Sequence, residues 1–342
     1  MDYALPLLAR KLDQNGIDPD HLILNTTNPV LIAMQKKYCR VGTCPPEWAI
    51  LHYRPNFIGN TIYLAMFGLL LAGQLWFGIR KKTYKYCATV CLGVIGEMVG
   101  YVGRLMLNKN PFPMNNFLIN LVPLTVAPAL LTGGIYLCLG RVITAIGSEN
   151  SRLRPKWYTY IFVGSDLFSL ILQAAGGAMA STAKDKKGSD LGVKIMIAGL
   201  IFQVASMIVF FAIWGDFALR VKRAEKKGTL ARSQPPLYRD LRDSGLLRWF
   251  QWSLFIATIL IFIRCIYRVA ELWGGFNSEL ANHELTFMIF EGPLIIGAVS
   301  AMTVYHPGRV FDKLWDAAGK GIRAMKLEDP ESHLLNTEYS RV

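Results

Sequence analysis

Residues 86–106, YCATVCLGVIGEMVGYVGRLM, form an apolar stretch long enough to cross a lipid bilayer, yet this stretch contains Glu97 and Arg104. A helix needs about 20 predominantly apolar residues to cross a hydrocarbon core roughly 30 Å thick. A charged side chain is costly in that core, so it usually faces the interior of a helix bundle or a polar cavity. The stretch therefore predicts a membrane helix that belongs to a bundle.

Six further stretches share this apolar character. Of the 342 residues, 52% are hydrophobic and 18% are charged, and the mean hydropathy is +0.30. Membrane helices tolerate proline when neighbours satisfy the freed carbonyl, so Pro123 and Pro128 predict one kinked span and not two short ones. We predict an all-α membrane protein, a seven-transmembrane helix bundle with spans 57–79, 86–106, 117–140, 158–180, 191–214, 252–274 and 285–304.

The distribution of Lys and Arg predicts the orientation. With the N-terminus outside, the cytoplasmic segments hold 22 basic residues and the outer segments hold 10. Cytoplasmic loops normally carry the excess, which favours an outer N-terminus and a cytoplasmic C-terminus. The predicted divisions are an outer segment 1–56, a transmembrane domain 57–304 and a cytoplasmic tail 305–342. In the tail, apolar residues at helical spacing from Phe311 to Met325 predict a short interfacial amphipathic helix on the inner leaflet, and 328–342 is expected to be disordered.

The outer segment contains two candidate modification sites. Asn25 begins a glycosylation sequon, which is usable on the lumenal side. Cys39 and Cys44 lie in the same segment, where a disulfide could persist. No secretory signal peptide precedes them, so the first span is expected to act as the targeting signal.

The formal net charge of +13 is explained by membrane contact and requires no nucleic acid. Most of the excess lies in predicted cytoplasmic segments, where it would meet anionic lipid headgroups. The loop 216–249 is the most basic of these, and it is also a candidate site for a cytoplasmic protein partner.

Charged residues in three spans fall at overlapping depths. With a rise of about 1.5 Å per residue, Glu97, Arg264, Arg268 and Glu291 share the outer half of the bilayer, and Arg104 and Glu271 lie nearer the outer surface. We predict a buried ionic network among the four residues at overlapping depths, namely Glu97, Arg264, Arg268 and Glu291. Such a network can bind a ligand, or it can act only as a structural contact that fixes helix register.

A second polar group lies on the fourth span. Asp166, Ser169 and Gln173 share one face, Gln203 of the fifth span falls at the depth of Asp166, and Gly176 and Gly177 allow close helix approach. No basic residue is evident at the depth of Asp166. That carboxylate is therefore a candidate counter-ion for a cationic substrate or a candidate proton carrier, whereas Gln173 can equally serve as an interhelical hydrogen-bonding residue.

Several chemistries have no support in the sequence. No G-x-x-x-x-G-K-[ST] loop is present, the seventh span has no lysine for a retinal Schiff base, and all five histidines lie outside the spans or at their ends. Neither a His cluster for zinc nor a Ser-His-Asp arrangement can be placed at matched depths. We expect no cofactor, no metal and no enzymatic activity.

The polar motifs, taken in order, resemble those of the fungal lipid-translocating exporter family, also called the RTA-like family. Glu97-x-x-Gly-Tyr-x-x-Arg104 and Arg264-x-x-x-Arg-x-x-Glu271 are similar to its signatures, although Phe287 and Glu291 stand where tyrosine and aspartate are common in the family. The match covers residues 50–310 and includes Tyr53-Arg54-Pro55-Asn56, Asn60, Pro128, Tyr136, Gly140-Arg141, Asp166, Gln173, Gly176-Gly177, Glu284, Pro293 and His306-Pro307-Gly308.

This resemblance implies a multi-pass integral protein of the plasma membrane or another endomembrane, linked to translocation of sphingoid bases, resistance to toxic amphiphiles or porphyrin movement. The first hypothesis is a translocator of amphiphilic lipids or lipid-like toxins, whose partners are membrane lipids and an amphiphilic small molecule. The alternative is a seven-helix receptor or regulator that changes lipid asymmetry or drug tolerance indirectly.

Overall fold

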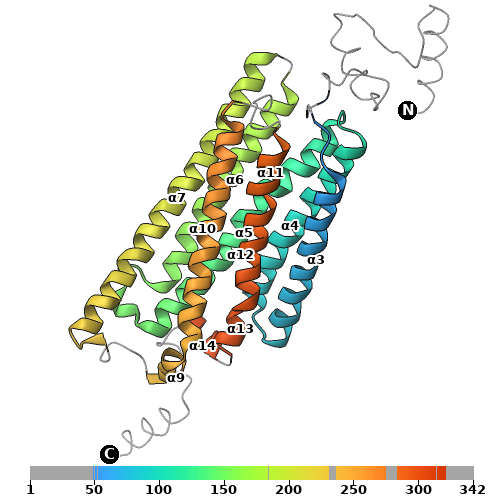
Figure 1. The fold of residues 1–342 in the computed structure, drawn as a ribbon. Helices are drawn as coiled ribbons and strands as arrows, with labels where there is room; N and C mark the ends of the chain where they lie inside the picture. Colours follow the sequence, from blue (N-terminus) through green and yellow to red (C-terminus); the bar gives the residue numbers. More distant parts are fainter. Residues whose placement is uncertain are drawn as a thin grey trace, which may run out of the picture.

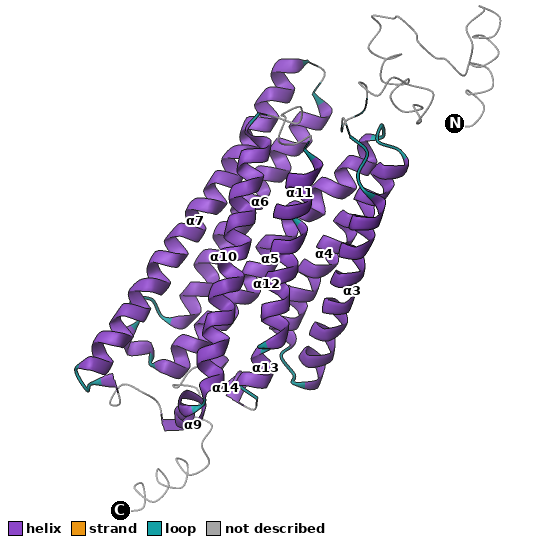
Figure 2. Ribbon diagram, viewed as in Figure 1, coloured by secondary structure: helices purple, strands orange, loops and turns teal. Residues whose placement is uncertain are grey.

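The computed structural model is a bundle of long antiparallel helices (Figures 1 and 2). It describes residues 49, 51, 53–183, 185–230, 236–274, 283–312 and 314–320. In this part of the chain, seven helical segments are long and apolar enough to cross a membrane, as predicted. They are α3 (Phe57–Arg80), α4 (Tyr84–Lys109), α5 (Met114–Ile146), α6 (Pro155–Thr182), α7 (Lys186–Lys226), α10 (Gly245–Trp273) and the pair α11 (Glu284–Phe290) and α12 (Gly292–Val304).

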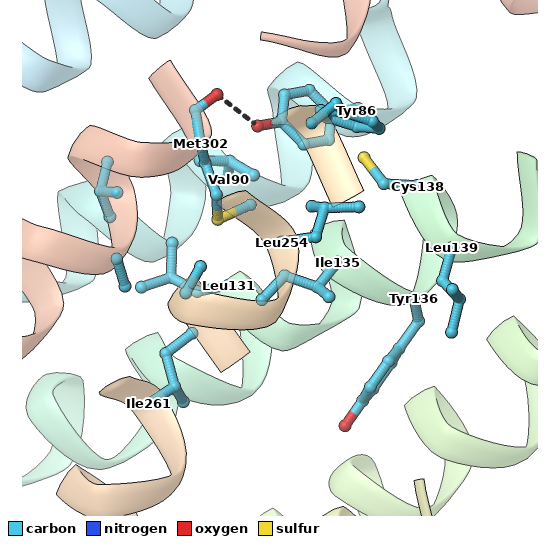
Figure 3. Packing of buried hydrophobic residues seen from close by; sticks show 14 of the residues in the cluster. Tyr86, Val90, Leu131, Ile135, Tyr136, Cys138, Leu139, Leu254, Ile261 and Met302 are labelled. Atoms are coloured by element: carbon cyan, nitrogen blue, oxygen red, sulfur yellow. Dashed lines mark hydrogen bonds between the residues drawn. The ribbon is translucent and has the colours of Figure 1, made fainter. Parts of the chain in front are cut away.

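The surface and the core of the bundle are both apolar. Outward-facing side chains such as Leu69 and Tyr160 are 75% and 70% exposed. A contiguous apolar surface of this kind is typical of a protein surrounded by lipid. Inside, side chains of α4, α5, α10 and α12 pack together, and the Tyr86 hydroxyl donates to the Met302 carbonyl oxygen at 3.4 Å (Figure 3).

Glycines allow the closest helix approaches. On α4, glycines 93, 96, 100 and 103 lie along the face that packs on α5, and a Cβ at Gly103 would lie 2.5 Å from the Asn120 nitrogen. On α7, a Cβ at Gly192 would lie 2.4 Å from the Ala180 nitrogen of α6. Membrane helices associate through such small-residue contacts, because the hydrophobic effect does not drive apolar helices together in lipid.

Helix α5 lies at the centre of the bundle and is continuous through both of its prolines (Figure 1). Pro128 has no N–H to donate to the Leu124 carbonyl, which would otherwise be an unpaired acceptor within the membrane. A guanidinium N–H of Arg264 donates to that oxygen instead. The third predicted span is therefore one helix, and a buried arginine satisfies the carbonyl that Pro128 leaves free.

The seventh span differs from the sequence expectation, because it is broken at Glu291. Helix α11 ends at Phe290 and α12 starts at Gly292, with Pro293 in its first turn. The Tyr63 hydroxyl of α3 donates to the Met288 carbonyl oxygen at 2.8 Å, beside the break. Pro293 was the sequence signal for this discontinuity, since proline cannot supply a helical N–H.

Short helices cover the lower end of the bundle as drawn in Figure 1. They are η3 (Pro236–Tyr238), α9 (Arg239–Asp243), α13 (Pro307–Val310) and α14 (Leu314–Lys320), while η2 (Ser148–Asn150) lies in the loop after α5. Tyr238, Phe311, Trp315 and Ala318 are buried in the main core. The apolar face that the sequence assigned to the inner leaflet thus contacts the bundle at residues 311–318, and residues 321–342 lie outside the described part.

Candidate functional site

The ionic residues of the predicted network face the bundle interior, and two of them form an interhelical ion pair. Arg264 of α10 donates to Glu291, and these side chains are 2% and 0% exposed. Because Glu291 is the residue at which the seventh span breaks, the pair ties the break to α10. Arg264 also holds the Leu124 carbonyl, so its guanidinium joins three helical segments.

Glu97 lies buried on α4 without joining this pair by a hydrogen bond. Neither of its carboxylate oxygens has a hydrogen-bond partner among the described residues, and the same is true of the Tyr101 hydroxyl one turn away. A Cβ added to Gly292 would lie 2.7 Å from that hydroxyl oxygen, so Tyr101 abuts the helix break. The predicted network of four residues is therefore divided: Glu97 is near the break but contributes no ion pair.

A second ion pair and a guanidinium–aromatic cluster lie closer to the upper end. Arg268 donates to Glu271 one turn along α10. Arg104 donates to the Tyr53 hydroxyl at 2.9 Å and lies 3.7 Å from the Phe287 ring centroid. Burial raises the pKa of Tyr53, which keeps the phenol neutral as an acceptor for Arg104. Arg104 thus packs on the ring at the position where the family resemblance led us to expect tyrosine.

Asp166 has a different environment, made of hydroxyl groups. Its Oδ2 accepts from Thr132 Oγ1 at 2.8 Å and from the Tyr136 hydroxyl at 3.1 Å, both on α5. Its Oδ1 is buried and has no hydrogen-bond partner within the described ranges. The Tyr136 hydroxyl points away from the apolar side chains of Leu131 and Ile135 (Figure 3). The site therefore offers a buried carboxylate oxygen with no basic partner in the described part of the chain.

Sequence reasoning missed the two hydroxyl donors of Asp166. Thr132 and Tyr136 are four residues apart and therefore share one face of α5. Two hydroxyl side chains at that spacing and at the depth of Asp166 could have indicated that they donate to its carboxylate. The sequence singled out Arg141 only as part of a motif and did not give its partner: Arg141 lies 3.4 Å from the Trp315 ring centroid and donates to the Trp315 carbonyl at the lower end.

A chain of amide and hydroxyl groups extends along α6 from this site. Ser169 Oγ donates to the Gly199 carbonyl oxygen at 2.8 Å, and Gln173 Nε2 donates to Ser169 Oγ at 2.6 Å and to Gln203 Oε1 at 3.2 Å. The chain joins α6 to α7 where Gly199 allows close approach. Gln173 is therefore an interhelical hydrogen-bonding residue, and Gln173 Oε1 remains without a partner in the part of the chain that is described.

Other sequence-based candidates are not tested. Asn25, Cys39 and Cys44 lie outside the described residues. Cys87, Cys91, Cys138 and Cys265 lie within the spans and are buried free thiols, as is usual for cysteines that pack as small apolar side chains. No group of three or more His, Cys, Asp or Glu side chains suited to a metal ion occurs among the described residues.

Comparison with known proteins gives the family of this chain. Residues 90–314 match the family described as "RTA1 like protein". The chain belongs to the RTA1-like family. It is 33% identical over 279 residues to the "Sphingoid long-chain base transporter RSB1" of Saccharomyces cerevisiae (strain Lalvin EC1118 / Prise de mousse), a match that covers 75% of this chain and 73% of the relative.

Two further relatives from Saccharomyces cerevisiae have different names. The chain is 31% identical over 222 residues to "Protoporphyrin uptake protein 1", a match that covers 64% of this chain and 68% of the relative. It is 28% identical over 234 residues to "Protein RTM1", with 68% and 71% covered. No solved structure matches this chain. The RTA1-like family thus includes relatives named for different amphiphilic molecules.

Proposed function

We propose that this protein is a translocator that moves single-chain amphiphiles with an amine head, such as sphingoid bases, across a membrane. The observation that carries the proposal is the Asp166 carboxylate, which is buried in the bundle with one oxygen unpaired and no basic partner among the described residues. The name of the 33% identical relative supports the same substrate class.

The chemistry of the site fits a cationic head. A buried carboxylate attracts an ammonium group more strongly than one in water, because the surrounding dielectric constant is lower. Thr132 and Tyr136 hold Oδ2 and leave Oδ1 for the ligand. The tail of the amphiphile stays in lipid while the head uses the bundle, so the protein needs no cavity for the whole molecule.

The ion pairs would have a supporting function in this mechanism. Arg264–Glu291 connects the break in the seventh span to α10, and Arg268–Glu271 lies further towards the upper end. We assign these residues, with Arg104, to positioning the helix segments on either side of the break at Glu291. Glu97 has no hydrogen-bond partner among the described residues and is the candidate for a proton-carrying group in the same layer.

The proposed orientation places the N-terminus outside and the C-terminus in the cytoplasm, at the plasma membrane. The excess of basic residues in the loops at the lower end supports it. Because the sequence has no P-loop, transport would follow a gradient or speed equilibration between leaflets.

Transport can be tested in phosphatidylcholine vesicles that contain the purified protein. A fluorescent sphingoid base is added, and its movement between leaflets is measured by quenching from one side. Wild-type protein should raise the rate well above that of protein-free vesicles. Equal rates in both preparations would reject the proposed function.

A receptor or regulator remains the second candidate, favoured by one feature of the loop between α7 and α10. Helix α7 continues to Lys226, well past the predicted end of its span, and Tyr238 and Leu241 pack in the core of the bundle. Such a loop could pass a change in the bundle to a cytoplasmic partner. Deleting 227–235 keeps both anchors: a receptor should lose its output, whereas a self-contained translocator should keep its rate.

A further inference from the structure

A groove on the lipid-facing side of the bundle lies between α5 and α6, in the half nearer the upper end. Its volume is about 280 Å³. This volume is near the lower limit for a pocket that encloses a whole drug-sized ligand. The groove is therefore large enough for one part of an amphiphile, such as its head, and not for the whole molecule. Small side chains of α6 hollow the surface here, namely Ala174, Gly177, Ala178 and Ser181, opposite Leu118, Val122 and Thr125 of α5.

One polar group in the lining has an unused acceptor. Gln173 is 4% exposed, lines the groove, and leaves its Oε1 without a hydrogen-bond partner among the described residues. The orientation of its amide follows from the hydrogen bonds. Ser169 gives its single hydroxyl hydrogen to the Gly199 carbonyl, so Ser169 Oγ can only accept from Gln173, which fixes the amide nitrogen on that side.

Asp166 does not line the groove, but it lies on the same helix as Gln173. Gln173 and Asp166 are seven residues apart, which is nearly two helical turns and about 10 Å along the axis. Both positions offer an unpaired oxygen, Oε1 of Gln173 and Oδ1 of Asp166, and neither offers an unpaired N–H donor. A site that offers free hydrogen-bond acceptors but no free donors favours a ligand head with N–H or O–H groups. It disfavours a phosphate or carboxylate head, whose oxygens would be buried without a donor.

We propose that this groove is the lateral entry site, where the ammonium or hydroxyl head of a single-chain amphiphile leaves the lipid and binds Gln173 before it reaches Asp166. The inference rests on the proposed function and adds the route and the head chemistry. The tail needs no enclosed space, because the groove opens towards lipid at Val122, which is 51% exposed.

The first test blocks the groove with a bulky apolar side chain. Val122→Trp should lower the rate of sphingoid-base movement at least tenfold. The matched control is Val209→Trp on α7, since Val209 is also 51% exposed but does not line the groove. If transport by wild type is robust and both variants match it, the entry site is wrong while the proposed function stands.

The second test needs no variant and no transport. A long-chain amino alcohol with a photoreactive group close to its head is crosslinked to wild-type protein in phosphatidylcholine vesicles, and the labelled peptides are mapped. Labelling should fall on 118–126 and 170–181 and be reduced by unlabelled amino alcohol, but not by an alkyl phosphate of equal chain length. Labelling elsewhere, or equal competition by the phosphate, would overturn the proposal even if transport is observed.

Removing the acceptor gives a third measurement. Gln173→Leu should weaken binding of the amino alcohol about tenfold or more, the effect expected when a hydrogen bond to a charged donor is lost. Unchanged affinity in a folded Gln173→Leu protein would exclude Gln173 as the head-binding group.

Discussion

Replacing Asp166 with asparagine should remove transport of amines without destabilising the protein. Asparagine has nearly the same shape, and its amide oxygen can still accept from Thr132 and Tyr136. What it loses is the ability to carry a negative charge. The substitution therefore separates the charge of this position from its role in packing.

The substitution changes two free energies, that of binding an ammonium group and that of unfolding. An ammonium 4 Å from a carboxylate at an effective dielectric constant of 20 gains about 4 kcal/mol, which corresponds to roughly a thousandfold in the binding constant. For stability, weakening two hydrogen bonds from charged to neutral costs about 2 kcal/mol in total. That loss is offset by avoiding the burial of an unpaired ion, a penalty of several kcal/mol. Stability should thus stay the same or rise.

The assay is leaflet-to-leaflet movement of a fluorescent sphingoid base, measured together with thermal unfolding in detergent. The matched control is Asp216→Asn, because Asp216 is partly exposed and pairs with Arg152 at 2.9 Å and Arg220 at 2.8 Å. Solvent-exposed pairs of this kind contribute little to stability, so the control should fold and transport normally. Normal transport by Asp166→Asn, or a large loss of its thermal stability, would refute the reasoning.

The remaining predictions concern stability. Arg264→Met should destabilise the bundle by about 3–5 kcal/mol, because it leaves the Glu291 carboxylate buried alone, and adding Glu291→Leu should recover much of that loss in a denaturant titration. Gly192→Val should prevent α6 and α7 from packing, whereas Gly164→Val, with no atom within 4 Å of the added Cβ, should leave the folded yield measured by size exclusion nearly unchanged. Trp315→Ala should cost about 3–5 kcal/mol through lost core packing and should make the chain after residue 310 more sensitive to protease, an effect that Trp273→Ala at a 69% exposed site should not produce.

Much of the polar interior was predictable, because charges in apolar spans must turn inward. Glu97, Arg264 and Glu291 are buried for this reason, as hydropathy and depth predicted. Their pairing was not predictable. Depth places residues in a layer but does not give the rotation of each helix, and rotation decides that Arg264 meets Glu291 and not Glu97.

The same limit explains the missed partners of Asp166. The absence of a basic residue at its depth was apparent from the sequence, but the facing helix was not. Only packing shows that α5 supplies Thr132 and Tyr136. The groove beside Gln173 also depends on two helices at once, since small residues on α6 make a hollow only where α5 leaves space.

The sequence by itself determined the class of the protein, its seven spans and the inward position of its charges. These follow from local properties: the length of apolar runs and the cost of a charge in hydrocarbon. The tertiary structure decided the break at Glu291, the donor that satisfies Leu124 and the unpaired oxygens that a ligand could use. The physical reason is that hydrogen bonds and ion pairs act over about 3 Å, a distance set by helix rotation and contact, which no single span encodes.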